Sequence, residues 1–330
     1  VKPLVDCLTV QAYLNEVRLE LYVAPYNQYA QEILDTSSQL HHFAADVVLV
    51  ILTPEAVVPG IISEPWQGST IRQELVQRGL TALTDLLTAL RDRSRATIIV
   101  SNLVLHQMSP LGVLDWQEPL GFERAIQELN HGIADWAHRQ ERVYVFDLAG
   151  VSSIFGRERA FDQRMHLLAD QPFAPAFLPR LGAEAVRYLH ATTSPIRKCL
   201  VLDLDNTLWG GILGDDGPDR LRLGGDAVGG AYREFQKTIL TLHNRGVLLA
   251  ICSHNDEAAG MDVLRNHPEM ILRPEHFAAE RINWLDKVDN LQSLAEELNI
   301  GLDSLVFLDD DPFQRQNVRE RLPEVLVVDL

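Results

Sequence analysis

The sequence predicts an α/β protein of two domains, each built around a parallel β-sheet. Apolar runs of strand length alternate with longer segments of helical periodicity through the 330 residues. This alternation is typical of layered α/β folds, and a chain of this length commonly holds two domains. Prolines crowd residues 172–179, and a polar stretch follows at 191–195. Because neither segment continues a helix, we place the domain boundary near residue 195, giving domains 1–195 and 196–330.

The first predicted domain reads as a three-layer α/β sandwich. The run 47–52 is wholly apolar, as a strand buried on both faces requires. The arrangement resembles an SGNH-like layer sandwich, which we expect to serve as a lid or a docking surface. A serine hydrolase is an alternative, since Ser101-Asn102 follows a strand and Asp162 precedes His166, but a Gly-x-Ser-x-Gly elbow is missing. The predicted strands are 19–24, 47–52, 97–101 and 143–147, and the predicted helices are 27–34, 70–91, 122–139 and 180–190.

Composition and charge restrict the classes of function. The net charge of −17 argues against a nucleic-acid partner and against an anionic membrane surface. The apolar runs are too short to span a bilayer. Three widely spaced cysteines, Cys7, Cys199 and Cys252, favour a reducing cytoplasm over a disulfide framework. The chain starts at Val1 and ends in an apolar run, so we interpret it as a domain of a longer polypeptide, with an arbitrary chain boundary as the alternative.

The second predicted domain is organised around an apolar strand that leads into Asp203 and Asp205. Residues two apart in a strand point the same way, so both carboxylates can converge where the strand ends. Two carboxylates held together are unfavourable unless a cation lies between them or one keeps a proton. Magnesium with a phosphate suits such a site, because Mg²⁺ prefers hard oxygen ligands and leaves room for a substrate.

Further polar side chains stand at other strand ends and helix starts of this half. Strand 247–252 leads into Ser253 and His254 at the start of a helix, where hydroxyl and backbone donors can bind phosphate. Lys287 opens another helix, and strand 305–308 leads into Asp309-Asp310-Asp311-Pro312. We also expect a tight hairpin flap at residues 210–217, a helix at 231–244 and a final strand at 325–330.

This ordered set suits metal-assisted phosphoryl transfer through an aspartyl intermediate. One carboxylate attacks phosphorus, and a second protonates the leaving oxygen and then activates water. A serine and a lysine neutralise the phosphoryl oxygens, and distal acids complete the metal site. Each element is weak evidence alone, but the whole series on alternating strands and helices indicates phosphoryl chemistry.

The segment Asp203-Leu204-Asp205-Asn206-Thr207 resembles the DxDxT signature of the haloacid dehalogenase (HAD) superfamily, and the later motifs follow in the expected order. The resemblance implies a Rossmann-like parallel sheet with the flap as its minimal cap, and Mg²⁺ as cofactor. It implies Asp203 as nucleophile and Asp205 as general acid/base. The implied metal ligands are Asp203, the backbone carbonyl of Asp205, and Asp309 or Asp310; the implied phosphate-binding residues are Asn206, Thr207, Ser253, His254 and Lys287.

Longer motifs are similar to the FkbH-like glyceryl transferases of polyketide synthases. The resemblance covers nearly the whole chain and implies a cytoplasmic enzyme within a larger modular synthase. Such an enzyme removes phosphate from 1,3-bisphosphoglycerate and loads a D-glyceryl unit as a thioester onto the phosphopantetheine arm of an acyl carrier protein. The family usually has Lys in place of His254 and Asn in place of Asp311. The motifs are Lys198–Gly211, Ile251–Ser253, Ile282–Trp284, Asp309–Pro312, Val23–Tyr29, Gln31–Leu34 and Pro172–Phe173.

The acyl step needs either a thiol relay or direct attack by the carrier thiol. Cys252 is our candidate relay, because a helix N-terminus near it would lower the pKa of its thiol; a buried apolar residue is the alternative. Cys199 lies about 13 Å from Asp203 along the strand, and we interpret it as a core residue.

Two other functions stay open. One is a Mg²⁺-dependent phosphatase of a small phosphometabolite or a phosphoprotein, and the other is an inactive scaffold within a synthase. An acidic carrier would need a basic docking patch, for which the candidate segments are residues 91–95, 157–164 and 315–321.

Overall fold

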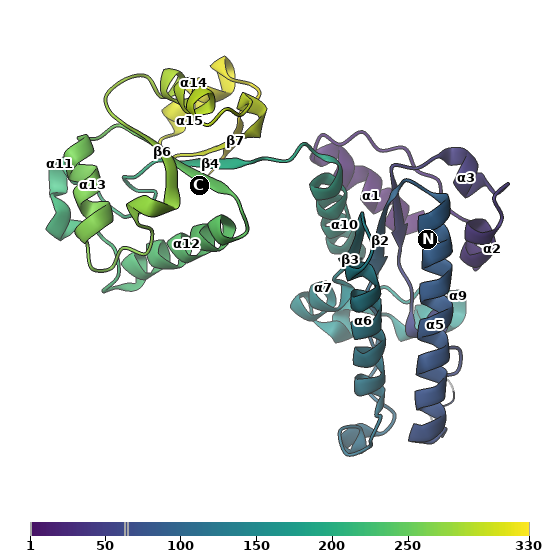
Figure 1. The fold of residues 1–330 in the computed structure, drawn as a ribbon. Helices are drawn as coiled ribbons and strands as arrows, with labels where there is room; N and C mark the ends of the chain where they lie inside the picture. The colour runs from purple at the N-terminus through teal and green to yellow at the C-terminus, as the bar shows by residue number, and fades with distance from the viewer. Residues whose placement is uncertain (1, 63, 65, 330) are drawn as a thin grey trace. The chain divides into compact units, whose positions relative to one another are not determined.

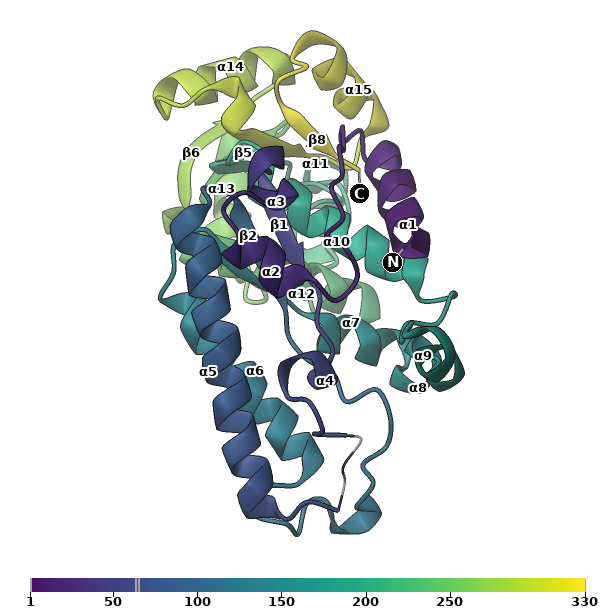
Figure 2. The same ribbon diagram turned by 90° about the vertical axis from the view of Figure 1, so that its right-hand side faces the viewer.

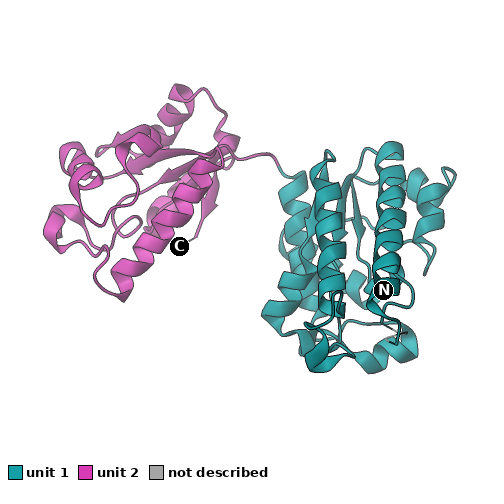
Figure 3. Cartoon of the chain, turned by 60° about the horizontal axis from the view of Figure 1, so that its bottom comes forward, with its two compact units in different colours: residues 1–194 teal, residues 195–330 magenta. Residues whose placement is uncertain are grey.

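The computed structural model describes residues 2–62, 64 and 66–329. They form two compact units that meet at Ser194 and Pro195 (Figures 1, 2 and 3). Val1 and Leu330, the ends of the chain noted above, lie outside the described residues. Among the described helices, none combines the length and the apolar character needed to cross a membrane.

The first unit is a three-layer sandwich around a parallel sheet with strand order β1-β2-β3. Side chains alternate between the faces of β2, so Ile98 and Val100 pack with α5 and α6, whereas Ile99 packs with α1 and α10. The strands are β1 (Val47–Val50), β2 (Thr97–Ser101) and β3 (Val143–Phe146). The helices are α1 (Lys2–Leu14), α2 (Tyr29–Leu34), α3 (Gln39–Phe43), α4 (Pro54–Val57), α5 (Ser69–Arg93), η1 (Gly112–Leu114), α6 (Phe122–His138), α7 (Leu148–Phe155), α8 (Arg157–Ala160), α9 (Gln163–Ala169) and α10 (Leu178–Thr193).

Most expected elements of this unit are confirmed, but the strand predicted at residues 19–24 is wrong. In the structure that stretch belongs to no helix or strand, and Leu21 and Val23 are exposed. Its alternating pattern mimics a half-buried strand, yet a strand also needs a hydrogen-bonded neighbour. The helix predicted at residues 180–190 begins earlier, because Pro179 stands in its first turn, where the missing N–H costs nothing.

The second unit is also a three-layer sandwich, with a five-stranded parallel sheet in the order β6-β5-β4-β7-β8. Helices α12 and α13 pack on one face of the sheet, and α14 and α15 pack on the other. The strands are β4 (Cys199–Leu202), β5 (Leu248–Ser253), β6 (Phe277–Ile282), β7 (Leu305–Leu308) and β8 (Leu326–Val328). The helices are α11 (Leu213–Asp216), η2 (Pro218–Arg220), α12 (Ala227–Asn244), α13 (Glu257–Asn266), η3 (Pro274–His276), α14 (Lys287–Glu297), η4 (Leu302–Ser304) and α15 (Pro312–Arg321).

Strand β4 lies at the centre of this sheet, and its position determines where a site can form. Leu202, its last residue, is in register with Ile251 of β5 and with Leu308 of β7. Three neighbouring strands therefore end at the same edge, and the residues that follow them meet there.

The segment after β4 differs from the predicted tight hairpin. Gly210 pairs with Arg222 in an antiparallel bridge, and the chain between them forms α11 and η2. Gly211 and Gly217 have φ values of +106° and +75°, which residues with a side chain rarely adopt. The flap is thus a short helical excursion closed by the bridge, and α12 follows it directly before β5.

Candidate active site

Four of the predicted site residues come together at the carboxyl edge of the β5-β4-β7 strands. Asp203 follows β4, Ser253 ends β5, Asp309 follows β7 and Lys287 is the first residue of α14. All four side chains are buried. The motifs that stand far apart in sequence therefore surround a single point.

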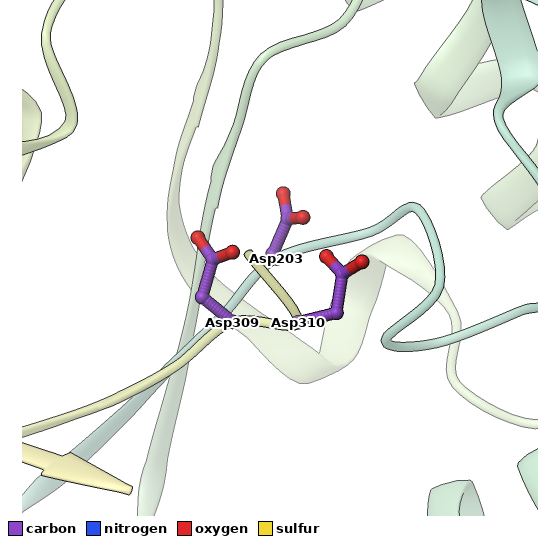
Figure 4. A group of neighbouring side chains, drawn as sticks. All are labelled: Asp203, Asp309 and Asp310. Carbon is purple, nitrogen blue, oxygen red and sulfur yellow. The ribbon is translucent and has the colours of Figure 1, made fainter. Parts of the chain in front are cut away.

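The acidic members of this group are Asp203, Asp309 and Asp310, which point toward the same side in Figure 4. Each contributes a carboxylate oxygen, and these oxygens all lie within 4.8 Å of one another. Asp309 is 0% exposed and Asp203 only 6% exposed. Lys287 Nζ lies 2.6 Å from Asp309 Oδ2 and 3.1 Å from Asp203 Oδ1, so one cation serves both buried carboxylates.

Burial and mutual repulsion change the pKa values in this cluster. Burial raises the pKa of Asp203 to about 6, since the attraction of Lys287 offsets only part of the desolvation and Asp309 repels the charge. The pKa of Asp310 is likewise raised by burial and by Asp309. Burial alone would lower the pKa of Lys287, but Asp203 and Asp309 outweigh it and raise that pKa above its ordinary value. The lysine is therefore charged at neutral pH.

These residues fit a divalent cation. Three carboxyl groups face one ammonium group, so the acidic side chains outnumber the lysine that balances them. Asp203 Oδ1 is buried and accepts no hydrogen bond with acceptable geometry from the described residues, although Lys287 lies nearby. An oxygen of this kind is available to a metal, and a set of hard oxygen donors matches Mg²⁺ or Ca²⁺ better than a softer metal.

Asp205 lies beside this cluster, and its carboxylate is held by three donors. Oδ1 accepts from Trp209 Nε1 at 2.9 Å and from the Leu213 backbone N–H at 3.1 Å. Oδ2 accepts from Asn255 Nδ2 at 2.9 Å. The side chain is outside the group of three carboxylates described above. This placement agrees with a proton-transfer role for the side chain and leaves only its backbone carbonyl for a metal.

The predicted phosphate-binding residues take different positions. Ser253 is 1% exposed, and its side chain interacts with Asp203 in a way that favours the charged form of that carboxylate. Asn206 Oδ1 accepts from the Gly211 N–H at 2.9 Å and fixes the start of the flap, and the Thr207 hydroxyl is buried without a hydrogen-bond partner among the described residues. His254 Nε2 donates to the Leu285 carbonyl at 2.8 Å, and its ring stacks on Trp284.

Comparison with known proteins then identifies the family. The model of the FkbH N-terminal domain matches residues 4–189, which is more than half of the chain. The chain belongs to the FkbH family. No curated protein matches the chain.

A solved structure resembles this FkbH-family chain along almost its whole length. It is the N-terminal part of BF1531 from Bacteroides fragilis, described as containing a phosphatase domain and complexed with Mg. The two share 29% sequence identity with a TM-score of 0.80, over 98% of this chain and 85% of the other. A second match, to a Pnkp1/Rnl/Hen1 complex, has 14% identity over 88% of this chain and 89% of the other, with a TM-score of 0.27. The first match confirms the predicted fold class, a HAD-type Rossmann-like domain with a flap as its cap, preceded by a second α/β sandwich.

In this FkbH-family chain the reactive environment predicted for Cys252 is absent. Its side chain is 0% exposed and packs with Val201, Ala250 and Val288 on the α14–α15 side of the sheet. Burial raises the pKa of the thiol to about 12, instead of the lowering expected from a helix N-terminus. Adjacent strand residues face opposite sides, so Ser253 reaches the site and Cys252 does not. Assigning Cys252 as a catalytic residue is therefore corrected to a core position, and Cys199 is also a core residue.

Three residues that sequence reasoning missed support the site. Trp209 and Asn255 hold Asp205, as described above. Arg315 donates to the backbone carbonyl oxygens of Asp309 and Asp310, at 2.7 Å each, and so fixes the loop that carries both carboxylates. The spacing of Ser253 and Asn255 is the same two-residue spacing that pairs Asp203 with Asp205, and it could have pointed to Asn255.

Proposed function

We propose that residues 195–330 catalyse Mg²⁺-dependent phosphoryl transfer through a phosphorylated aspartate, which makes the domain a phosphatase. The observation that carries this proposal is the convergence of Asp203, Asp309, Asp310 and Lys287 at one strand edge. The similar structure from Bacteroides fragilis, described with a phosphatase domain and Mg, supports it.

Each side chain has a separate task in this mechanism. A carboxylate oxygen of Asp203 attacks phosphorus while the bond from phosphorus to the leaving oxygen breaks. Asp205 gives a proton to that oxygen and later takes one from the water that hydrolyses the acyl phosphate. Lys287 and Ser253 offer positive charge and a hydroxyl donor to the phosphoryl oxygens. Asp203, Asp309, Asp310 and the Asp205 carbonyl would hold Mg²⁺, which would supply further neutralisation of the phosphoryl charge.

Phosphate release from acyl and alkyl phosphates tests the phosphatase proposal. The full chain should release phosphate with Mg²⁺ and lose that activity with EDTA. Asp203→Asn should reduce release to background, because the amide oxygen is a poor nucleophile. Asp311→Asn is the matched control, since it removes a nearby carboxylate that only caps a helix. Retained turnover in Asp203→Asn would exclude the aspartyl intermediate.

At a finer level, we propose that the chain is a glyceryl transferase acting on 1,3-bisphosphoglycerate. The D-glyceryl unit would pass as a thioester to the phosphopantetheine arm of an acyl carrier protein in polyketide biosynthesis. Membership of the FkbH family supports this substrate and partner. The burial of Cys252 favours direct attack by the carrier thiol over a relay through that cysteine.

A carrier-loading assay tests this finer proposal. The chain, Mg²⁺, 1,3-bisphosphoglycerate and a phosphopantetheinylated carrier are incubated together, and the intact mass of the carrier is measured. We expect a carrier that gains one glyceryl unit, with Cys252→Ala loading as well as the wild type. Phosphate release without a heavier carrier would leave the plain phosphatase as the function.

The charge pattern distinguishes two of the three arginine-rich segments as docking sites for an acidic carrier. Arg315, Arg319 and Arg321 are already paired with aspartates, so much of the positive charge of residues 315–321 is balanced within the chain. Arg91 and Arg93 donate to backbone carbonyl oxygens, which have no net charge to compensate theirs. We therefore favour residues 91–95 over 315–321.

A further inference from the structure

Asn255 joins two groups of the proposed active site. It stands between Ser253, the last residue of β5, and Asp256, the N-cap of α13, and its side chain is 3% exposed. Its Nδ2 donates to Asp205 Oδ2 at 2.9 Å and lies 3.4 Å from Ser253 Oγ. The mechanism proposed above gives this buried amide no task.

The two oxygens of Asp205 differ in how many donors they accept. Oδ1 accepts two, from Trp209 Nε1 and the Leu213 N–H, whereas Oδ2 accepts one, from Asn255. A carboxylate oxygen offers about two lone pairs. Oδ1 is therefore fully used, and Oδ2 retains one lone pair. Oδ2 is thus the oxygen that can exchange a proton with a substrate.

Asn255 differs from the other two donors to Asp205 in the part of the fold from which it comes. Trp209 and Leu213 belong to the segment that directly follows Asp205, so they hold its carboxylate from the same stretch of chain. Asn255 comes from the end of the neighbouring strand, which also carries Ser253. The amide therefore fixes Asp205 relative to the residue that is proposed to hold the phosphoryl group.

Resting on the proposed phosphatase function, we infer that Asn255 is a positioning residue that aims Asp205 Oδ2 at the leaving group. In the step it serves, the Asp203 oxygen forms a bond to phosphorus and the bond from phosphorus to the leaving oxygen breaks. The electron pair of the broken bond stays on the leaving oxygen. That oxygen takes the proton from Asp205 Oδ2, so atoms and charges balance.

This role predicts a dependence on the leaving group. An alkoxide is a strong base and needs the proton as the bond breaks, whereas p-nitrophenolate is a weak base and departs without one. Loss of the correct orientation of the Asp205 carboxylate should therefore slow the hydrolysis of alkyl phosphates far more than that of aryl phosphates. A purely structural role would lower both rates together.

The test compares glycerol phosphate with p-nitrophenyl phosphate as substrates of the full chain with Mg²⁺. For Asn255→Ala we expect kcat for glycerol phosphate to fall roughly 10- to 100-fold, a part of the 10²–10⁴-fold that general acid catalysis supplies. The same kcat for p-nitrophenyl phosphate should fall less than about 3-fold. Asn255→Asp keeps the volume but removes the donor, and should show the same selective loss.

Asn290→Ala is the matched control, since Asn290 is another asparagine of the same unit that is 3% exposed, and it bonds to Asn283. It should leave the ratio of the two rates unchanged. If kcat falls by the same factor on both substrates in both Asn255 variants, so that the ratio of the two rates is unchanged, the inference is overturned. Asp203→Asn on the same substrates reports separately on the phosphatase proposal.

A structural readout keeps the inference testable if the wild type hydrolyses neither substrate. The crystal structure of the Asn255→Ala chain would then decide. Displacement of the Asp205 carboxylate from its present position supports the positioning role. An Asp205 side chain that keeps its place and its remaining contacts contradicts it.

Discussion

Cys252 shows how strongly one position in a strand changes the chemistry of a residue. Its neighbour Ser253 reaches the active site, whereas the Cys252 sulfur lies among apolar side chains and makes a long contact, 3.9 Å, to the Lys287 carbonyl. Because the thiolate is the reactive form, a pKa near 12 makes this thiol inert at neutral pH.

We therefore predict that Cys252 and Cys199 resist alkylation in the native chain. A maleimide at pH 8 should label Cys7, which is partly exposed, and should label all three cysteines only in denaturant. Mass spectrometry of the peptides measures the labelling. Native labelling of Cys252 as fast as that of Cys7 would contradict its buried position.

A second residue-scale effect concerns His106 in the first unit. Its ring meets His166 edge-on at 4.9 Å, and Nδ1 is buried without a hydrogen-bond partner among the described residues. Burial, and then repulsion from His166, lowers the pKa of His106 below its ordinary value, while Glu55 opposes this weakly. Asp170 Oδ1 lies 3.2 Å from His166 Nδ1.

The lowered pKa makes the first unit sensitive to acid. A group with a folded-state pKa below its unfolded value adds stability above the unfolded value, and this stability is lost as the pH falls through the folded value. We predict that the unfolding free energy of the first unit falls between pH 7.5 and pH 5. His106→Gln should flatten this slope in urea titrations, whereas His131→Gln, at an exposed position, should not. An equal slope in His106→Gln would contradict the assignment.

At the scale of elements, Asp311 stands where the family motif usually has Asn, and its side-chain contact concerns the start of α15. Its side chain accepts from the Phe313 N–H at 2.8 Å and caps α15. Replacing an Asp N-cap by Ala costs about 1 kcal/mol, while Asn caps nearly as well. We predict this loss for Asp311→Ala and a change of only a few tenths of a kcal/mol for Asp311→Asn, measured by urea unfolding. Equal stability of both variants would contradict the capping role.

The elements that could be predicted from sequence are those buried on both faces. Strands β1, β4 and β7 are short apolar runs, because each is covered by helices on both sides of its sheet. Strand β6 was missed, since it contains Glu280 and Arg281. It is an edge strand, where polar side chains remain in contact with solvent or bond to a helix, as Arg281 does with Ser293.

The residues of the candidate site also fall into those that could be predicted from sequence and those that could not. Asp203, Ser253, Lys287 and Asp309 follow or begin regular elements, so their convergence was foreseeable from the topology of a parallel sheet. The residues that donate hydrogen bonds to the Asp205 carboxylate could not be foreseen in this way, because Trp209 and Asn255 act through loop conformations that have no periodic signature. The prediction of a tight hairpin at residues 210–217 was wrong for a similar reason. The glycines of this segment allow both a hairpin and the observed helical excursion.

At the scale of the whole molecule, the chain consists of two units with separate cores. Two buried clusters belong wholly to the first unit, and two others wholly to the second. The active-site groups described above all lie after Pro195. A unit with its own core and a complete set of ligands should fold and bind metal by itself.

We predict that a fragment of residues 195–330 folds without the first unit and is stabilised by Mg²⁺. A ligand that binds only the folded state adds RT ln(1 + [L]/Kd), or about 2.7 kcal/mol at a hundredfold excess over Kd. Thermal unfolding should therefore shift upward by several degrees with Mg²⁺, and Asp309→Asn should remove most of that shift because a buried ligand is lost. A fragment without a cooperative transition would show that the second core depends on the first. A fragment that folds but gains nothing from Mg²⁺ would instead show that the three carboxylates do not form a metal site alone.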